Sequence, residues 1–262
     1  MEFTIEETQW TGKTGYYYDV LDSTNKKAKE LAEAGGPHGM IVVAGAQEAG
    51  LGRRGRSWSS EAGQGIYMSF VLRPEIEADK ASMLTLVTAL AVEKAIYSLT
   101  KYSDVTPFIK WPNDIVIRGK KVCGILTEMT MKDNQVDYIV VGIGVNVHNR
   151  EFPADIANIA TSLELEVGHA FARERLVELI MMQFEKYYAL FMQEQNLSLL
   201  LEEYQQVSAN KGRKVTVLDP AGQYEGIARG ITNKGELIVD TLEGTKLVSS
   251  GEVSVRGIYG YV

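Results

Sequence analysis

A loop rich in glycine and arginine carries the strongest chemical signal in this sequence. Residues 47–58 read Gln-Glu-Ala-Gly-Leu-Gly-Arg-Arg-Gly-Arg-Ser-Trp and follow an apolar run. Glycine lets the backbone approach a ligand closely, and guanidinium groups offer planar forks of donors to phosphate or carboxylate. Trp58 can stack on a purine or close an apolar slot. We expect this loop to order around an anionic, partly aromatic ligand, although a solvated basic loop has the same composition.

Two known phosphate-binding motifs do not fit this loop. A Walker A loop would continue with Gly-Lys-Ser or Gly-Lys-Thr, and neither follows. Gly50, Gly52 and Gly55 have the spacing of a dinucleotide-binding fingerprint, but no helix-opening pattern comes after them. The loop alone therefore does not identify its ligand.

A second candidate is the segment 110–114, Lys-Trp-Pro-Asn-Asp. The residue before a proline is held extended, so Trp111 is expected to end a strand. Asn113 and Asp114 then sit at the strand end, where they could reach a ligand or a metal. Pro-Asn-Asp is also ordinary turn chemistry.

One lysine follows in a strand that is otherwise apolar. An unpaired buried ammonium is costly, so this lysine either points to water or meets an anion. By strand alternation Lys121 shares a face with Cys123 and Ile125, which resemble core residues, while Lys120 faces the opposite side. We expect Lys121 to point inward to an anionic partner, with two solvated edge lysines as the alternative.

Residues 142–147, Gly-Ile-Gly-Val-Asn-Val, predict a shallow slot with a polar end. Alternation puts the apolar side chains on a core and Gly142, Gly144 and Asn146 on the other face. Glycine inside a strand often marks close approach of a ligand or another backbone. A helix packed on the sheet would also need glycines, but it would not explain Asn146.

Ser23-Thr24-Asn25 lies between an expected strand and an expected helix. Ser and Thr are ordinary caps. A helix N-terminus also binds anions, so these residues could hold a carboxylate or a ureido-type head group, and spacing alone does not decide.

The sequence offers no protein metal site and no catalytic triad. His38, His148 and His169 are scattered without metal-type spacing, and no Gly-x-Ser-x-Gly elbow exists. Cys123 is expected to be a small core residue.

The elements that must position these residues follow from apolar periodicity. Strands are expected at 16–20, 40–45, 65–72, 107–117, 120–131 and 136–147. Helices are expected from Asp22 or Ser23 to about Ala34, and at 79–99, 171–192 and 197–206. Short strands then follow at 213–218, 223–230, 236–240, 245–249 and 252–256. The first part is predicted to be α+β, and the second to be a small all-β module, expected to be a barrel.

The composition of the chain excludes several classes of protein. The 262 residues are 45% hydrophobic and 23% charged, which excludes global disorder and collagen-like repeats. The net charge of −7 argues against a non-specific nucleic-acid binder. A single cysteine favours a reducing compartment, here predicted to be the cytoplasm. The start lacks a signal pattern, and the apolar stretches, such as 83–92 and 138–145, look too short to cross a bilayer.

The ordered set of motifs resembles the biotin protein ligase family. The matching pieces are Ser23-Thr24-Asn25 and the segments 47–58, 110–114, 121–125 and 142–147, in the family's order and spacing. The resemblance implies a class II synthetase and biotin ligase-like catalytic domain with a mixed sheet over residues 1–210. It also implies a small SH3-like β-barrel over residues 211–262.

The resemblance implies a two-step reaction. Biotin and MgATP give biotinyl-5′-AMP and pyrophosphate, and the adenylate then passes biotin to one lysine of a carboxyl-carrier domain. Carried over by position, biotin would be bound by Ser23, Thr24, Asn25, Gln47, Gly50, Leu51, Gly52, Arg53, Lys121 and Gly124. ATP would be bound by Arg53, Arg56, Trp58, Asn113, Lys121 and Asn146, and Mg²⁺ would come with its phosphates.

Lys121 and Arg53 would be the catalytic residues. The attack of a carboxylate on phosphorus brings two anions together, and cations offset that repulsion. A loop closing over the adenylate would protect the mixed anhydride from water. No residue stands out as a base for the acceptor lysine.

Leu51 is a departure, because the family usually has arginine there. Backbone contacts would survive and a side-chain contact would be lost. The resemblance also implies a ligase-only type without an N-terminal DNA-binding domain, and a homodimer. The alternatives are a lipoate-protein ligase, a non-enzymatic nucleic-acid binder using its loop arginines, and a ligand-binding protein with a dead site.

Overall fold

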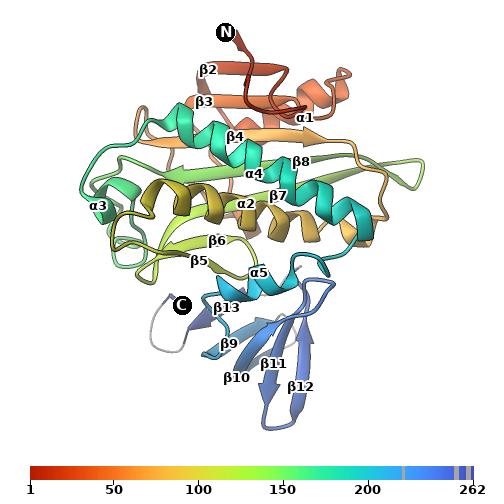
Figure 1. The fold of residues 1–262 in the computed structure, drawn as a ribbon, viewed down its shortest axis with the longest axis vertical. Coiled ribbons are helices and arrows are strands. Elements are labelled where there is room, and N and C mark those ends of the chain that lie inside the picture. Colours follow the sequence, from red (N-terminus) through yellow and green to blue (C-terminus); the bar gives the residue numbers. More distant parts are fainter. Residues whose placement is uncertain (220–221, 251–253, 258–260) are drawn as a thin grey trace.

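The computed structural model of the chain describes residues 1–219, 222–250, 254–257 and 261–262, which form two sheets (Figure 1). The larger sheet contains β1 (Glu2–Phe3), β2 (Gly15–Leu21), β3 (Ile41–Gln47), β4 (Gly65–Leu72), β5 (Pro107–Lys110), β6 (Asp114–Ile117), β7 (Lys120–Lys132) and β8 (Gln135–Asn146). Their order is β1-β2-β3-β4-β8-β7-β6-β5. Only the pair β2 and β3 runs parallel, so the sheet is mixed, as predicted.

The smaller sheet is antiparallel and lies at the other end of the molecule. Its strands are β9 (Lys214–Asp219), β10 (Gly222–Ile231), β11 (Leu237–Thr241), β12 (Gly244–Val248) and β13 (Ser254–Gly257). Within the described residues, β12 and β13 lie at the two edges of the order β12-β11-β10-β9-β13. The small C-terminal β domain is thus confirmed. Residues 252 and 253 of its last expected strand, and Pro220 of an expected turn, lie outside the described residues.

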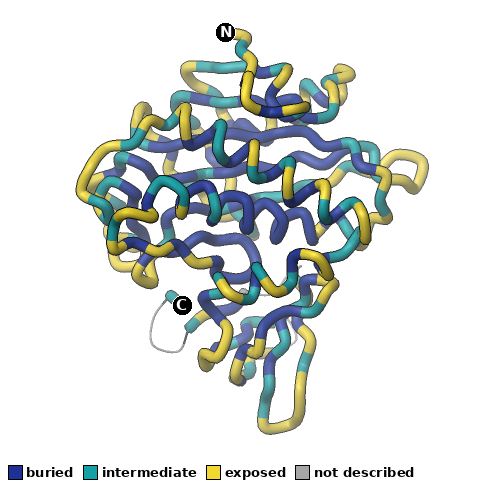
Figure 2. The backbone as a smooth tube through the Cα atoms, viewed as in Figure 1, coloured by how far each residue is buried: buried dark blue, intermediate teal, exposed yellow. Residues whose placement is uncertain are grey.

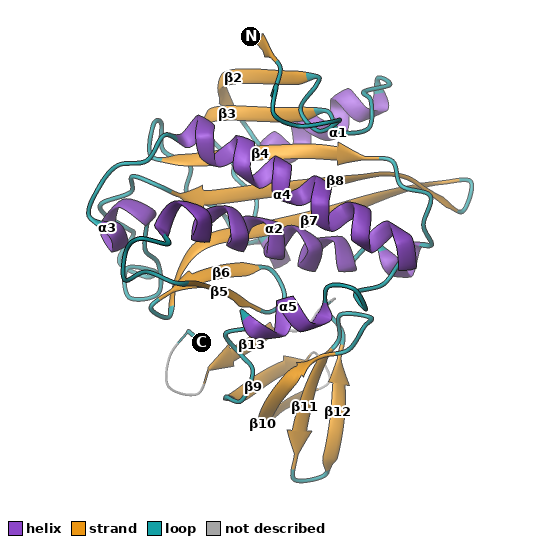
Figure 3. Cartoon of the chain, viewed as in Figure 1, coloured by secondary structure: helices purple, strands orange, loops and turns teal. Residues whose placement is uncertain are grey.

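Helices cover both faces of the larger sheet (Figure 3). The helices of the described residues are α1 (Thr24–Glu33), α2 (Met83–Thr100), α3 (Leu163–Val167), α4 (Arg173–Glu194) and α5 (Leu201–Gln206), with short 3-10 turns at Arg53–Gly55 and Ala78–Lys80. The predicted apolar stripe of α4 is buried, and α4 packs beside α2 over the main core. On the opposite face, α1 buries Ala28 and Ala32 in a second, smaller cluster.

The segment 107–117 is a hairpin rather than the single strand predicted. A cis peptide bond joins Trp111 to Pro112, and Lys110 pairs with Asp114 across the turn. Pro112 has no N–H for a strand ladder, so the chain turns there. The hairpin places the start of β6 beside β7, which brings Asp114 to the site described below.

The helix α2 is buried nearly all round, as Figure 2 shows. Together with the preceding turn it forms an apolar segment, Ala78–Thr100, that is long enough by composition to cross a membrane. Most of that segment is buried in the protein, between the sheet and α4. It is therefore a core helix, although it is longer than the apolar stretch noted in the sequence.

Glu93 is an ionisable group inside this core. Only 1% of it is exposed, and Lys94 Nζ lies 3.5 Å from Oε2, too far to give that oxygen a hydrogen bond. Burial raises the pKa of Glu93 to about 7. The folded chain therefore holds this proton more tightly than the unfolded chain does.

We expect this carboxyl to lower the free energy of unfolding by roughly 3 kcal/mol as the pH rises from about 4.5 to above 7. The loss follows because Glu93 must ionise in a buried place in the folded state. Glu93→Gln should remove this share of the pH dependence, measured by urea unfolding at several pH values. The exposed Glu202→Gln is the matched control. Parallel stability curves for Glu93→Gln and the wild type would contradict the expectation.

Candidate active site

A pocket lies on the α1 side of the larger sheet, beside the glycine-arginine loop. Motifs far apart in the chain meet in it, because its lining includes Ser23, Thr24, Asn25, Gln47, Leu51, Gly52, Arg53, Trp58, Asn113, Lys121 and Gly124. The rest of the lining comes from Ile125, Leu126, Gly142, Ile143 and Gly144.

The N-terminus of α1 supplies hydroxyl and amide groups to one wall. Gln47 Oε1 accepts hydrogen bonds from the Thr24 N–H at 2.8 Å and from Thr24 Oγ1 at 3.1 Å. Gln47 Nε2 donates to Ser60 Oγ at 2.8 Å. Ser23 occupies the N-cap position, but its side chain makes no capping hydrogen bond. Capping therefore does not account for the hydroxyl of Ser23 in the pocket wall.

Asn25 is held in one orientation by two other strands. Its Nδ2 donates to Glu128 Oε2 at 2.7 Å, and its Oδ1 accepts from Ser69 Oγ at 2.6 Å. Glu128 also pairs with Lys29 at 2.5 Å. An ionised carboxylate can only accept, so the amide nitrogen must face Glu128 and the oxygen must face Ser69. The polar end of the pocket is thus preorganised.

The glycines of β7 and β8 leave room for other side chains. A Cβ at Gly142 would lie 2.0 Å from Asn25 Oδ1. One at Gly144 would lie 2.5 Å from Trp58 Cε2, and one at Gly124 would lie 2.9 Å from Trp58 Cζ3. Only glycine fits under such contacts, so the slot expected from strand alternation is present and receives the Trp58 indole. The indole Nε1 is buried and has no hydrogen-bond partner among the residues that the structure describes, which leaves a donor for a ligand.

Lys121 points into the pocket and has the anionic partner that we expected. Its Nζ lies 2.7 Å from Asp114 Oδ1 and 5.2 Å from the centre of the Trp58 ring. Burial alone would raise the pKa of Asp114, but the charges of Lys121 and Lys110 hold this pKa below its usual value. Asp114 is therefore an ionised counterion, 7% exposed, beside the pocket.

The prediction that Lys121 shares a face with Cys123 is wrong. Val122 is an extra residue on β7 where the pairing with β6 shifts, which is a β-bulge. Lys121 consequently lies on the Gly124 side, where a Cβ at Gly124 would be 3.0 Å from its Nζ. Cys123 is fully buried in the core, and burial raises the pKa of its thiol, so it has the structural role expected.

Two further groups surround Asp114. Lys110 is 6% exposed, and burial lowers its pKa to about 8. Its Nζ lies 3.9 Å from the centre of the Tyr261 ring, and Tyr261 Oη donates a hydrogen bond to Asp114 Oδ2. Tyr261 thus contacts the carboxylate that is the counterion of Lys121.

Arg53 links the glycine-arginine loop to other segments. One guanidinium nitrogen donates to Asn113 Oδ1 at 3.0 Å, and another donates to the carbonyl oxygen of Ser250. Asn113 Nδ2 in turn donates to the carbonyl oxygen of Ile125 at 3.0 Å. These contacts fix the cationic part of the loop beside the start of β6 and the middle of β7.

Three predicted residues do not line the pocket. A Cβ at Gly50 would lie 2.4 Å from the carbonyl oxygen of Trp58, so Gly50 lets the two sides of the loop approach each other. Arg56 is exposed. Asn146 is buried and donates to the carbonyl oxygen of Thr161 at 3.0 Å.

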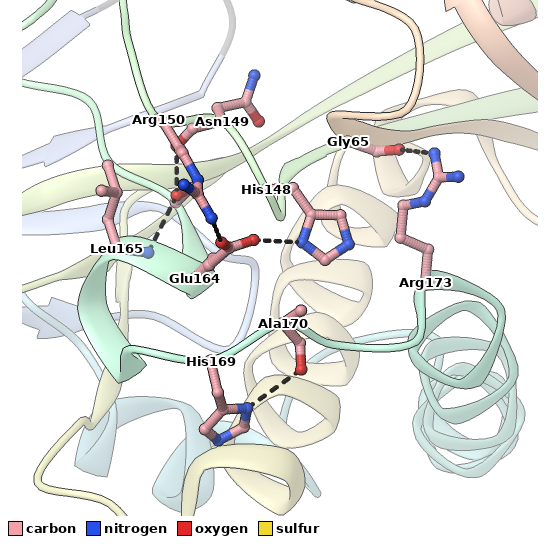
Figure 4. Close-up of polar contacts among 10 residues, drawn as sticks. Gly65, His148, Asn149, Arg150, Glu164, Leu165, His169, Ala170 and Arg173 are labelled. Atoms are coloured by element: carbon pink, nitrogen blue, oxygen red, sulfur yellow. Dashed lines mark hydrogen bonds and ion pairs between the residues drawn. The ribbon is translucent and has the colours of Figure 1, made fainter.

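The histidines take part in local contacts rather than a metal site. His148 Nδ1 lies 2.8 Å from Glu164 Oε2, and an Arg150 guanidinium nitrogen lies 2.6 Å from the other oxygen of that carboxylate (Figure 4). His169 contacts the carbonyl oxygen of Ala170. Within the described part of the chain, no three His, Cys, Asp or Glu side chains are grouped to hold a metal ion.

Sequence reasoning missed three contributors to this site and gave a fourth, Asp114, a different partner. Ser69 is the one small polar residue in the apolar strand 65–72, and Glu128 lies on the face of β7 that carries Leu126. A polar residue isolated on a buried strand was the available signal for Ser69, whereas Glu128 follows Thr127 on a partly exposed strand and had no such signal. Asp114 was expected to reach a ligand or a metal, not to be the counterion of Lys121, and nothing in the spacing connects Tyr261 to it.

Comparisons with known proteins agree with this geometry. The family described as biotin/lipoate A/B protein ligase matches residues 17–146, and the biotin protein ligase C-terminal domain matches residues 212–256. The chain belongs to the biotin/lipoate A/B protein ligase family. Within that family the matches favour a biotin ligase over a lipoate ligase.

The relatives carry ligase names, and several of these names specify biotin. The bifunctional ligase/repressor BirA of Bacillus subtilis is 38% identical over 95% of this chain and 76% of its own length. The biotin–[acetyl-CoA-carboxylase] ligase of Paracoccus denitrificans is 33% identical over 90% of this chain and 98% of its own. The structure of the Aquifex aeolicus biotin protein ligase in complex with biotin and ATP has a TM-score of 0.81 at 31% identity, covering 93% of this chain and 98% of that one.

Proposed function

We propose that this chain is an ATP-dependent ligase that forms biotinyl-5′-AMP and transfers biotin to a lysine of a carboxyl-carrier domain. One observation carries the proposal: a glycine-floored pocket has a fixed amide and hydroxyls on one wall and the Lys121 ammonium beside Asp114 on another. A ureido ring with donors and an acceptor suits the first wall. A carboxylate suits the second.

The same wall argues against lipoate as the substrate. The dithiolane ring of lipoate has no group to pair with the hydroxyl of Ser23 or with the second lone pair of Asn25 Oδ1, which accepts one hydrogen bond from Ser69. A site built for hydrogen bonding rejects a ligand that leaves its buried polar groups unpaired.

The first step needs cations where two anions meet. A carboxylate oxygen of biotin forms a bond to the α-phosphorus, and the bond from that phosphorus to the bridging oxygen breaks to release pyrophosphate. Lys121 offsets the repulsion between the carboxylate and the α-phosphate, and Arg53 stabilises charge on the phosphate oxygens. The unpaired Trp58 Nε1 offers a further donor.

Mg²⁺ fits this scheme as part of the nucleotide. The described residues supply no carboxylate cluster for a resident ion, so it would enter on the triphosphate. There it would neutralise phosphate charge. In the second step the neutral acceptor amine attacks the acyl carbon, an amide forms and AMP leaves.

The test is to incubate the protein with biotin, radiolabelled ATP, Mg²⁺ and a carboxyl-carrier domain. We expect labelled biotinyl-AMP and biotinylation of the carrier. Calorimetry with biotin and lipoate in parallel should show binding of biotin only. Lipoate binding without biotin binding would replace this proposal with the lipoate ligase, and absence of both acids from the site would reject the ligase function.

We also propose the division into a catalytic domain, residues 1–210, and a C-terminal domain, residues 211–262. The separate sheets support it.

A homodimer in the cytoplasm without nucleic-acid binding completes the proposal. In the described residues, β1 covers only the start of the outer edge of β2, and Val20 on that edge is 54% exposed, which supports pairing with a second copy. Sedimentation across a concentration series tests this pairing.

Glu128 should tune the affinity for biotin without touching it. Glu128→Gln removes the ion pair with Lys29 and replaces the charged acceptor that orients the Asn25 amide with a neutral side chain. We expect biotin to bind about tenfold more weakly by calorimetry, because a hydrogen bond to a charged group is lost. The exposed Glu30→Gln on α1 is the control. Unchanged affinity in Glu128→Gln would show that Asn25 needs no such support.

A further inference from the structure

We propose that Tyr261, near the C-terminal end of the chain, is a positioning residue for adenylate formation that acts through Asp114 on Lys121. This inference rests on the proposed ligase function. It gives the C-terminal segment a role in the first step, through the hydrogen bond from Tyr261 Oη to Asp114 Oδ2.

The two oxygens of Asp114 have different partners. Tyr261 Oη donates to Oδ2, and Lys121 Nζ lies 2.7 Å from Oδ1. With one oxygen tied to a phenol, the carboxylate cannot rotate about its Cβ–Cγ bond. Lys121 is thus drawn to one fixed point beside Gly124 rather than to either oxygen in turn.

Tyr261 contacts the cationic surroundings of this carboxylate as well. The centre of its ring lies 3.9 Å from Lys110 Nζ, and Lys110 is the strand partner of Asp114 across the β5–β6 turn. Cation–π contact suits a buried ammonium that has few water partners. Tyr261 therefore contacts both Asp114 and its neighbour Lys110, and it does so from outside the larger sheet.

The hydroxyl has a predictable electrostatic effect. Among the described residues, the charged groups that face Asp114 are the cations Lys121, Lys110 and Arg53, and the Tyr261 phenol and the Cys123 thiol are the other titratable groups that face it. A hydrogen bond to the charged form of a carboxyl lowers its pKa further. Loss of the phenol oxygen should raise the pKa of Asp114 and let both of its oxygens compete for Lys121. Lys121 would then be less available to the biotin carboxylate and the α-phosphate.

The informative variant is Tyr261→Phe, which keeps the ring against Lys110 and removes only the hydroxyl. Tyr102→Phe is the matched control, because Tyr102 is 93% exposed and lies in the turn after α2. We would measure biotin-dependent pyrophosphate release across pH, the KM for biotin and for ATP, and thermal unfolding. The transfer step would be measured separately with preformed biotinyl-AMP.

We expect Tyr261→Phe to lower kcat for adenylation about tenfold with KM values within about twofold, since a hydrogen bond to a charged group is lost. The acidic limb of its pH profile should move up by about one pH unit, because Asp114 loses a stabiliser of its charged form. Unfolding and transfer should match the wild type. Tyr261→Ala should show the same shift of the acidic limb, with an additional loss from the missing ring.

The wild type, assayed alongside, separates the two proposals. An inactive wild type counts against the ligase function. An active wild type with a Tyr261→Phe variant of equal kcat and equal acidic limb overturns the role of Tyr261. A variant that loses thermal stability but keeps the wild-type acidic limb also overturns it, because Tyr261 is then only a structural contact.

Discussion

Lys121→Ala should reduce the rate of adenylate formation by roughly 100- to 1,000-fold, the range seen when one preorganised charge-stabilising group is removed. The ammonium lies in the pocket with its counterion fixed, so it needs little reorganisation to meet a carboxylate and a phosphate. Biotin-dependent pyrophosphate release measures the effect. Lys121→Met, which keeps most of the stem, should lose nearly as much, because charge rather than bulk is required.

Lys120→Ala is the natural control for this substitution. Lys120 precedes Lys121 on the same strand and is exposed. It should retain wild-type rates in both half-reactions. If Lys121→Ala adenylates biotin as fast as Lys120→Ala, the catalytic assignment of Lys121 fails.

Gly142→Ala should weaken biotin binding by about 10- to 100-fold, the size expected from overpacking a filled site. The new methyl group would lie 2.0 Å from Asn25 Oδ1, and Asn25 cannot yield without breaking its bonds to Ser69 and Glu128. Calorimetry with biotin measures the loss.

Gly144→Ala provides a second test of the same slot through a different neighbour. Its methyl group would lie 2.5 Å from the Trp58 indole, which sits on a loop rather than on the sheet. We expect a smaller loss of biotin affinity, because a loop residue can move. Thermal unfolding of both variants separates a local clash from a damaged fold, and wild-type affinity in Gly142→Ala would show that the slot does not hold the ligand.

Much of the fold was readable because its signals are local. The apolar stripe of α4 repeats with the helical period, and the glycine face of β8 follows from alternation along one strand. The glycine-arginine loop is recognisable by composition. Each of these signals lies within a single element, where a fixed period along the sequence determines which side chains share a face.

The contacts among Lys121, Asp114 and Tyr261 could not be predicted, because they depend on pairing between separate elements. Strand alternation put Lys121 on the core face, and the bulge at Val122 moved it to the pocket face. The pairing of Asp114 depends on a hairpin that was expected to be one strand. Its contact with Tyr261 joins residues 147 positions apart, and no periodicity spans such a gap.

Trp58 gives the pocket an optical property. Its indole lies on Gly144 and 5.2 Å from the Lys121 ammonium, whereas Trp111 is 1% exposed in the core and Trp10 packs against Tyr188 on the far side of the sheet. A ligand that enters the slot must alter the surroundings of Trp58 and leave the other two indoles unchanged. The tryptophan emission of the unlabelled protein should therefore report occupancy of the site in real time, with Trp58→Phe as the silent reference.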